Sequence, residues 1–191
     1  MKEIYPVPEG LKKTARTNEA DYFERYQKSI DHPEEFWAEQ ANKLEWIKPF
    51  TKVKDTSFEE NNFKVEWFAD GQLNISANCL DRHLKEHPYK PAIIWEGDHP
   101  SRHKIISFSE WHDETCRFAN VLKKNGVKKG DRIALIANNA PEWNMIDFAI
   151  QQVGAICIPI YPTISHDDYD YIFKHSEASI VFVSNKFLYS K

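Results

Sequence analysis

The sequence predicts an α/β fold in which crossover helices alternate with the strands of a layered, largely parallel sheet. From Ser109 onward, helical patterns are followed by short apolar runs such as Ile133 to Ile136, which have no polar alternation. Runs of this kind are typical of strands that are covered on both faces. Because the same helix and strand unit then occurs twice more, we expect parallel crossover connections through the second half of the chain.

Residues 1–62 are expected to be a mostly helical segment that follows an extended, proline-containing leader. Asp31, Pro33 and Glu34 form a start signal in which aspartate caps free amides and proline occupies the first turn. They predict a helix over 33–44. Its apolar stripe consists of Phe36, Trp37, Gln40, Ala41 and Leu44. A short isolated helix is marginal in water, so we expect residues 1–62 to pack on a core formed by residues 63–191.

The region before the repeated units predicts a strand, a turn, a short helix and a pair of strands. Phe63, Val65 and Trp67 alternate as in a half-buried strand, and Asp70 with Gly71 forms a turn pair that tolerates positive φ. A helix is predicted over 77–86. Strands are predicted over 92–96 and 104–108, separated by the turn-forming residues 97–100.

The repeated units each carry start and stop signals. Ser109 is the expected cap of a helix that ends before Gly126, and its buried face consists of Trp111, Thr115, Phe118 and Leu122. The second helix opens at Asn139, Pro141 and Glu142, shares a face of Trp143, Ile146, Ile150 and Val153, and ends at Gly154 before a strand over 156–158. The third starts at a capping-box pair, Ser165 and Asp168, runs to about His175 and precedes a strand over 180–183.

Composition limits the class of protein. The 191 residues carry a net charge of −4 without a basic block, so we expect no nucleic-acid partner. Cys79, Cys116 and Cys157 are odd in number and widely spaced, which predicts packed thiols in a reducing compartment. No window is long and apolar enough for a membrane span, and a cytoplasmic protein is expected.

Several segments resemble a known family. Residues 66–84 read EWFADGQLNISANCLDRHL, residues 32–50 read HPEEFWAEQANKLEWIKPF, and residues 90–98 read KPAIIWEGD. These segments, together with residues 107–132, resemble the amino-terminal part of AMP-forming acetyl-CoA and propionyl-CoA synthetases. The resemblance implies the first α/β subdomain of the large amino-terminal domain of adenylate-forming enzymes.

Beyond Ile133 the resemblance changes. Residues 138–143 read NNAPEW and residues 159–165 read PIYPTIS, and both are closer to long-chain fatty acyl-CoA synthetases of the same superfamily. In place of the second of these segments, acetyl enzymes usually carry a Gly-Gly loop. The chain can therefore be a natural intermediate between subfamilies, a fused chain, or a sign that the subfamily boundary is drawn too sharply.

The resemblance implies an acetate-CoA ligase that uses ATP, coenzyme A (CoA) and Mg²⁺ in its complete form. Ligands of open α/β sheets lie beyond the carboxyl ends of the strands, and Asn138, Asn139 and the loop Tyr161, Pro162 and Thr163 follow two of them. By resemblance the loop borders the CoA or acyl channel. Taken singly, these residues also fit structural roles, with Asn139 as a helix cap, Pro159 and Pro162 as strand terminators and Tyr161 as a packed aromatic.

Chemical groups that the reaction requires are missing between residues 1 and 191. The six glycines stand singly, so the phosphate-binding loop rich in Ser, Thr and Gly is absent. We expect no catalytic residue and no tightly bound cofactor in this chain, which alone should be inactive. The remaining alternatives are a non-catalytic binding or interaction module, or a portion of a long-chain enzyme.

Two further expectations concern metals and self-association. Residues 83–87 read HLKEH and match a zinc-binding pattern, but Pro88 ends the helix there and short patterns match often by chance, so we expect no metal site. A sheet that is cut short after Val183 is expected to leave an edge that natural proteins usually cover. An uncovered edge strand pairs readily with another chain, so we expect self-association.

Overall fold

The apolar runs form a three-stranded parallel sheet in the computed structural model, which describes residues 5–99 and 101–190. The strands are β5 (Arg132–Ile136), β6 (Ile156–Pro159) and β7 (Ile180–Val183), and their order in the sheet is β6-β5-β7. In the register, Ile133 lies opposite Cys157 of β6 and Ile180 of β7. The predicted α/β fold with parallel crossovers is confirmed.

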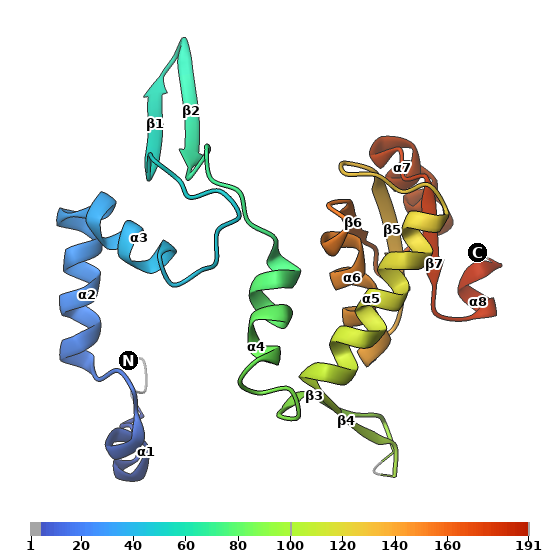
Figure 1. Ribbon diagram of the computed structural model, residues 1–191, viewed down its shortest axis with the longest axis horizontal. Coiled ribbons are helices and arrows are strands. Elements are labelled where there is room, and N and C mark those ends of the chain that lie inside the picture. Colours follow the sequence, from blue (N-terminus) through green and yellow to red (C-terminus); the bar gives the residue numbers. More distant parts are fainter. Residues whose placement is uncertain (1–4, 100, 191) are drawn as a thin grey trace. The chain divides into compact units, whose positions relative to one another are not determined.

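Helices cover both faces of this sheet (Figure 1). On one face, Ile133 packs with Leu122 of α5 (Phe108–Lys124) and Ile150 of α6 (Pro141–Gln152). On the other face, Ile136 packs with Tyr169 of α7 (His166–Ser176) and Leu188 of α8 (Lys186–Tyr189). Residues 133–136 are between 0% and 4% exposed. The central strand β5 is therefore the core of this part of the chain.

The chain divides into two compact units, Met1–Gly71 and Gln72–Lys191, which we call the amino-terminal and carboxyl-terminal units. The sheet belongs to the carboxyl-terminal unit. This unit begins with a π-helix, η1 (Ala77–Asp81), and a short α4 (Arg82–Leu84), which together match the predicted helix over 77–86. Strands β3 (Pro91–Glu96) and β4 (His103–Ser107) follow as an antiparallel hairpin, as predicted. Pro100 of the predicted turn lies outside the described residues.

Helix caps differ from the prediction at two positions in this unit. The cap of α5 is Ser107 rather than Ser109, because Ser107 and Glu110 stand three residues apart and bond reciprocally, with backbone amide to oxygen distances of 3.2 and 2.8 Å. The cap of α6 is Ala140 rather than Asn139, and it makes no side-chain bond. The predicted Ser165 and Asp168 box at the start of α7 is confirmed, as is the left-handed Gly126, with φ 83°.

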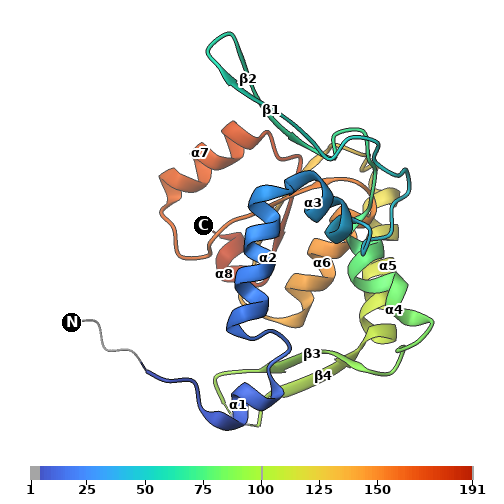
Figure 2. The same ribbon diagram turned by 90° about the vertical axis from the view of Figure 1, so that its left-hand side faces the viewer.

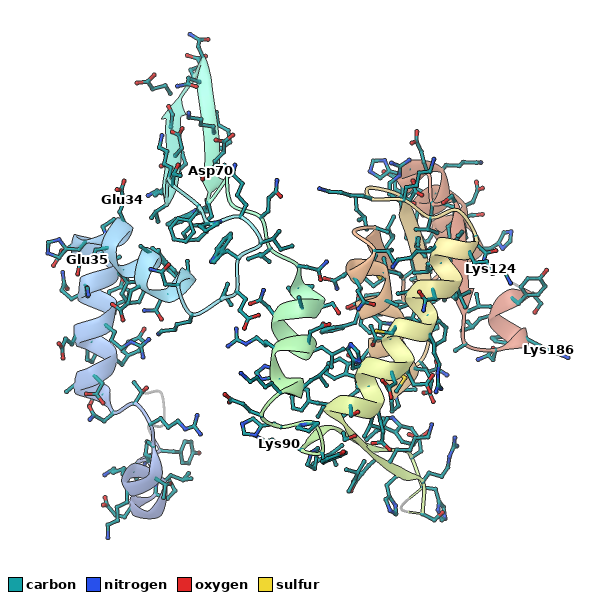
Figure 3. All side chains as sticks on the ribbon, viewed as in Figure 1. Glu34, Glu35, Asp70, Lys90, Lys124 and Lys186 are labelled. Carbon is teal, nitrogen blue, oxygen red and sulfur yellow. The ribbon has the colours of Figure 1, made fainter. Side chains whose placement is uncertain are left out.

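The amino-terminal unit contains α1 (Glu9–Thr14), α2 (Glu19–Asp31), α3 (Pro33–Ala41) and an antiparallel hairpin of β1 (Lys54–Glu59) and β2 (Asn62–Trp67). Figure 2 shows α2 and α3 as consecutive helices of this unit, and Figure 3 shows Glu34 and Glu35 at the first turn of α3. Residues 1–4 of the predicted leader lie outside the described residues.

Two details of α3 were predicted wrongly. Asp31 belongs to α2 and accepts hydrogen bonds from the Gln27 amide, so the residue before α3 is His32, which makes no capping bond. The helix ends at Ala41 rather than Leu44. After Ala41 the backbone closes into turns, because the Lys43 and Leu44 amides bond to carbonyls three residues back, at 3.1 and 3.0 Å. The Ala41 carbonyl also accepts a 2.9 Å hydrogen bond from the Trp46 indole.

The predicted half-buried alternation of β2 is also wrong. Phe63 is 70% exposed and Val65 is 52% exposed. The partner strand β1, which the sequence did not reveal, pairs with β2 in a two-stranded sheet. The positive φ of the following turn falls on Phe68 (51°), whereas Gly71 is required because a Cβ there would meet the Trp46 ring at 2.5 Å.

The three cysteines have different surroundings. Cys79 is exposed, so the prediction of packed thiols is wrong for this residue, while Cys116 and Cys157 are half-buried. Burial and a hydrogen bond to the Asp147 carboxylate raise the pKa of Cys157 to about 12. Its thiol is therefore protonated at neutral pH, which fits a structural role.

Candidate functional site

Two cavities open at the carboxyl edge of the parallel sheet, one on each side of β5. The β5–β6 cavity has a volume of about 600 Å³. The β5–β7 cavity has a volume of about 830 Å³ and is also lined by the β3–β4 hairpin. Helix α6 covers one face after β5, whereas α7 and α8 cover the other face after β6 and β7. The connection after β5 thus runs to one face of the sheet, whereas the connections after β6 and β7 run to the other face. In open α/β sheets, ligands bind in the crevices between strands whose connections diverge in this way.

A single loop separates the two cavities. Ala137, Asn138 and Asn139 follow β5 and line both of them, as does Trp143 in the first turn of α6. We call residues 137–140 the β5 loop. It is placed where the sequence predicted a ligand turn, but Trp143 was not predicted as a site residue, although its position next to that turn could have revealed it.

The predicted loop Tyr161, Pro162 and Thr163 lines the β5–β6 cavity, opposite the β5 loop. The structure thus brings together the two ligand turns that the sequence singled out. The side chain of Tyr161 is 79% exposed, so it is not the packed aromatic of the structural alternative.

A buried tyrosine holds the Tyr161 loop in place. The Tyr169 hydroxyl donates a 3.0 Å hydrogen bond to the Tyr161 carbonyl, and Tyr169 is 5% exposed. Burial raises the pKa of Tyr169, so the hydroxyl keeps its proton and its donor role. This anchor depends on a fold contact between α7 and the loop, which no sequence motif signals.

The β5–β6 cavity is electrically neutral. Its lining consists of Ala137, Asn138, Asn139, Trp143 and residues 159–163, and none of these described residues carries a charged side chain. Its polar groups are amides and hydroxyls, which bind neutral hydrogen-bonding chains. Phosphate groups require cations or clustered backbone amides instead. The cavity therefore suits a neutral, amide-containing or apolar chain.

The histidines of the HLKEH pattern do not form a shared site. His83 lies in α4, and its ring packs against Phe108 at 5.1 Å between centroids, while His87 lies after the end of α4. Within residues 5–99 and 101–190, no group of three or more His, Cys, Asp or Glu side chains is arranged to hold a metal ion.

Fold and cavities together define an open α/β protein with two cavities at the carboxyl edge of its parallel sheet. The AMP-binding enzyme family model matches residues 80–190, which is more than half of the chain. The chain therefore belongs to the AMP-binding enzyme family. A second model, described as the acetyl-coenzyme A synthetase N-terminus, matches residues 22–79.

Curated relatives agree with the predicted resemblance to acetyl-CoA synthetases. The chain is 42% identical over 185 residues to the acetyl-coenzyme A synthetase of Psychrobacter cryohalolentis, covering 95% of this chain and 28% of that protein. It is 46% identical over 165 residues to the enzyme of Parvibaculum lavamentivorans, covering 86% and 26%. The resemblance to acetyl-CoA synthetases is thus confirmed, and the chain spans little more than a quarter of these relatives. Neither relative supports the long-chain resemblance of the residues after 133.

A solved structure agrees with the fold. The acetoacetyl-CoA synthetase from Streptomyces lividans superposes with a TM-score of 0.74 at 20% sequence identity, covering 82% of this chain and 24% of that protein. At this identity the similarity concerns the fold alone. No helix within residues 5–99 and 101–190 combines the length and apolar character of a membrane span.

Proposed function

We propose that this chain is the amino-terminal portion of an AMP-forming acetate-CoA ligase. In the complete reaction, an acetate oxygen attacks the α-phosphorus of ATP and pyrophosphate leaves, which forms acetyl-adenylate. The sulfur of CoA then attacks the acetyl carbonyl carbon, its proton is lost, and AMP leaves. ATP, CoA and Mg²⁺ are the proposed cofactors and substrates, and a cytoplasmic location is proposed with them.

The neutral β5–β6 cavity is the observation that supports a role on the CoA side. The arm of CoA that carries the thiol is uncharged and contains two amides, which match the amide and hydroxyl lining of this cavity. We assign Tyr161, Pro162 and Thr163 to the wall of the CoA or acyl channel on this basis. The segment of residues 159–165 lacks the Gly-Gly pair that acetyl enzymes usually carry there, so the channel should be narrower at this loop.

Adenylation chemistry is assigned to residues outside this chain. A developing negative charge on phosphorus needs cations and a flexible phosphate loop, and the single, scattered glycines of residues 1–191 form no such loop. We propose that no catalytic residue lies in this chain. Its contribution is structural support and one wall of the ligand cleft, and the packing of residues 1–62 on the core formed by residues 63–191 is part of the same proposal.

Incubation of the 191-residue chain with MgATP, CoA and either acetate or palmitate should release no AMP above a no-protein control. AMP can be measured by chromatography, and the complete protein provides the positive control. In the complete protein acetate should support AMP release, and palmitate should support much less. AMP release by the chain alone would contradict the proposal that the catalytic residues lie outside it. A preference of the complete protein for palmitate would favour the long-chain alternative.

A non-catalytic binding module is the second candidate, because the β5–β6 cavity is formed without any other segment. Calorimetric titration of the chain with CoA separates the two candidates. A module should bind CoA tightly by itself, whereas a portion of an enzyme should bind it weakly because the opposite wall of the cleft is missing.

We also propose that the 191-residue chain self-associates through its parallel sheet. Strands β6 and β7 are the two outer strands, and Ile156 of β6 is 51% exposed. Outer strands present unpaired amides and carbonyls to other chains. Sedimentation velocity should show the average mass rising with protein concentration. A single monomeric boundary at all concentrations would refute the proposal.

A further inference from the structure

The β3–β4 hairpin carries two polar side chains that reach the β5 loop and the start of α6. Trp95 of β3 and Lys104 of β4 are directly opposite one another in the hairpin register. Cross-strand partners project from the same face of a hairpin. Both side chains therefore act on one neighbouring structure.

Trp95 bonds directly to the β5 loop. Its indole nitrogen donates a 2.9 Å hydrogen bond to the backbone carbonyl of Asn139, which is 44 residues away in sequence. The indole lies against Gly97, where an added Cβ would approach the ring to 2.9 Å. The glycine thus leaves the space that this indole position requires.

Lys104 fixes the other end of the same segment. Its ammonium group lies 2.7 Å from the carboxylate of Glu142 in the first turn of α6. This hydrogen bond is the main reason why the pKa of Glu142 is lowered, so the Glu142 carboxylate is charged at neutral pH. Together the two contacts flank Ala140, the cap residue of α6 that makes no side-chain bond.

We propose that Trp95 is a positioning residue for the CoA-side cavity. The β5 loop lines both cavities, and its connection to α6 has no capping side chain of its own. The bond from Trp95 replaces that missing restraint and holds Asn138 and Asn139 at the wall of the β5–β6 cavity. This inference rests on the proposed function, because it assigns the cavity to CoA.

The test uses Trp95→Phe in the complete protein. Phenylalanine keeps an aromatic ring but removes the N–H donor. The KM for CoA should rise about fivefold, the factor that corresponds to one neutral hydrogen bond. Acetate-dependent exchange of pyrophosphate into ATP, which reports only the adenylation step, should stay within about twofold of the unchanged protein.

Three further variants sharpen the result. Lys104→Met should raise the KM for CoA in the same direction but less, because its ion pair is exposed to solvent, and Lys104→Arg should restore it. Ile105→Thr is the matched control, since Ile105 is 61% exposed on the opposite face of the hairpin; it should leave both steps unchanged. An equal loss of both steps in Trp95→Phe, or no change in either, would overturn the positioning role.

Hydrogen exchange on the 191-residue chain tests the positioning role of Trp95 without an activity measurement. Amides of residues 138–140 should exchange several-fold faster in Trp95→Phe than in Ile105→Thr. If the complete protein lacks acetate-dependent exchange of pyrophosphate into ATP, the proposed function fails. The hydrogen exchange experiment then still decides whether Trp95 restrains the β5 loop, and unchanged amide exchange would reject the positioning role of Trp95.

Discussion

Replacement of Ile133 with alanine should lower the free energy of unfolding of the carboxyl-terminal unit by about 3 kcal/mol. Ile133 is 0% exposed and packs in one cluster with Leu122 and Ile150. It lies in the central strand, with hydrogen-bonded neighbours on both sides. The surroundings can therefore collapse only partly into the vacated space, and the lost burial adds to the cost of the cavity.

Ile156→Ala is the matched control for this prediction. It makes the same chemical change in the neighbouring strand, at a side chain that is 51% exposed, so the loss should stay below about 1 kcal/mol. Urea denaturation of the whole chain, followed by hydrogen exchange of peptides from residues 132–160, measures both variants in the same unit. Equal losses would show that the core is not centred on β5.

The parallel sheet could be predicted from the sequence because its signals are local. Continuous apolar runs, the Ser165 and Asp168 capping box, and Gly126 after a helix each specify a structure within a few residues. The rule that open sheets bind ligands at their carboxyl edge then placed the Tyr161 loop beside the β5 loop. This part of the site follows from topology without any knowledge of side-chain contacts.

The errors arose where several residues competed for one role. Ser107 and Ser109 are both suitable caps, and the choice depends on Glu110, which stands three residues after Ser107. Asn139 is a good cap by type, but its backbone is held by Trp95 instead. At the end of α3 the Ala41 carbonyl bonds to the Trp46 indole, which is a contact that propensity does not contain.

The supporting residues of the site could not be predicted for the same reason. Trp95 and Asn139 are 44 residues apart, and they meet only because the hairpin lies beside the start of α6. Tyr169 reads as one more apolar residue of a helix, yet its hydroxyl anchors the Tyr161 carbonyl. Such roles depend on tertiary contacts, so they appear only in the structure.

Ala137→Phe should reduce acetyl-CoA formation by the complete protein about tenfold or more at a fixed CoA concentration. Ala137 is half-buried, directly follows β5 and lines both cavities. A phenyl ring there should fill part of the cavity space that Ala137 now borders. Because displacements of about 1 Å at a reacting group cost large factors in rate, the thioester-forming step should suffer most.

Comparison with other variants decides whether the loss of activity comes from the volume of the side chain at position 137. Ala137→Val should give an intermediate loss, since its bulk lies between that of alanine and phenylalanine. Ala20→Phe makes the same chemical change at an exposed position of α2 and should leave both steps unchanged.

Urea denaturation of Ala137→Phe should show that the free energy of unfolding falls by no more than about 3 kcal/mol, the usual range for an overpacked site. Adenylation measured by pyrophosphate exchange should fall less than thioester formation, because the β5–β6 cavity is assigned to CoA. A larger loss in adenylation than in thioester formation would contradict the assignment of the β5–β6 cavity to CoA. It would indicate that the β5 loop lies on the nucleotide side instead.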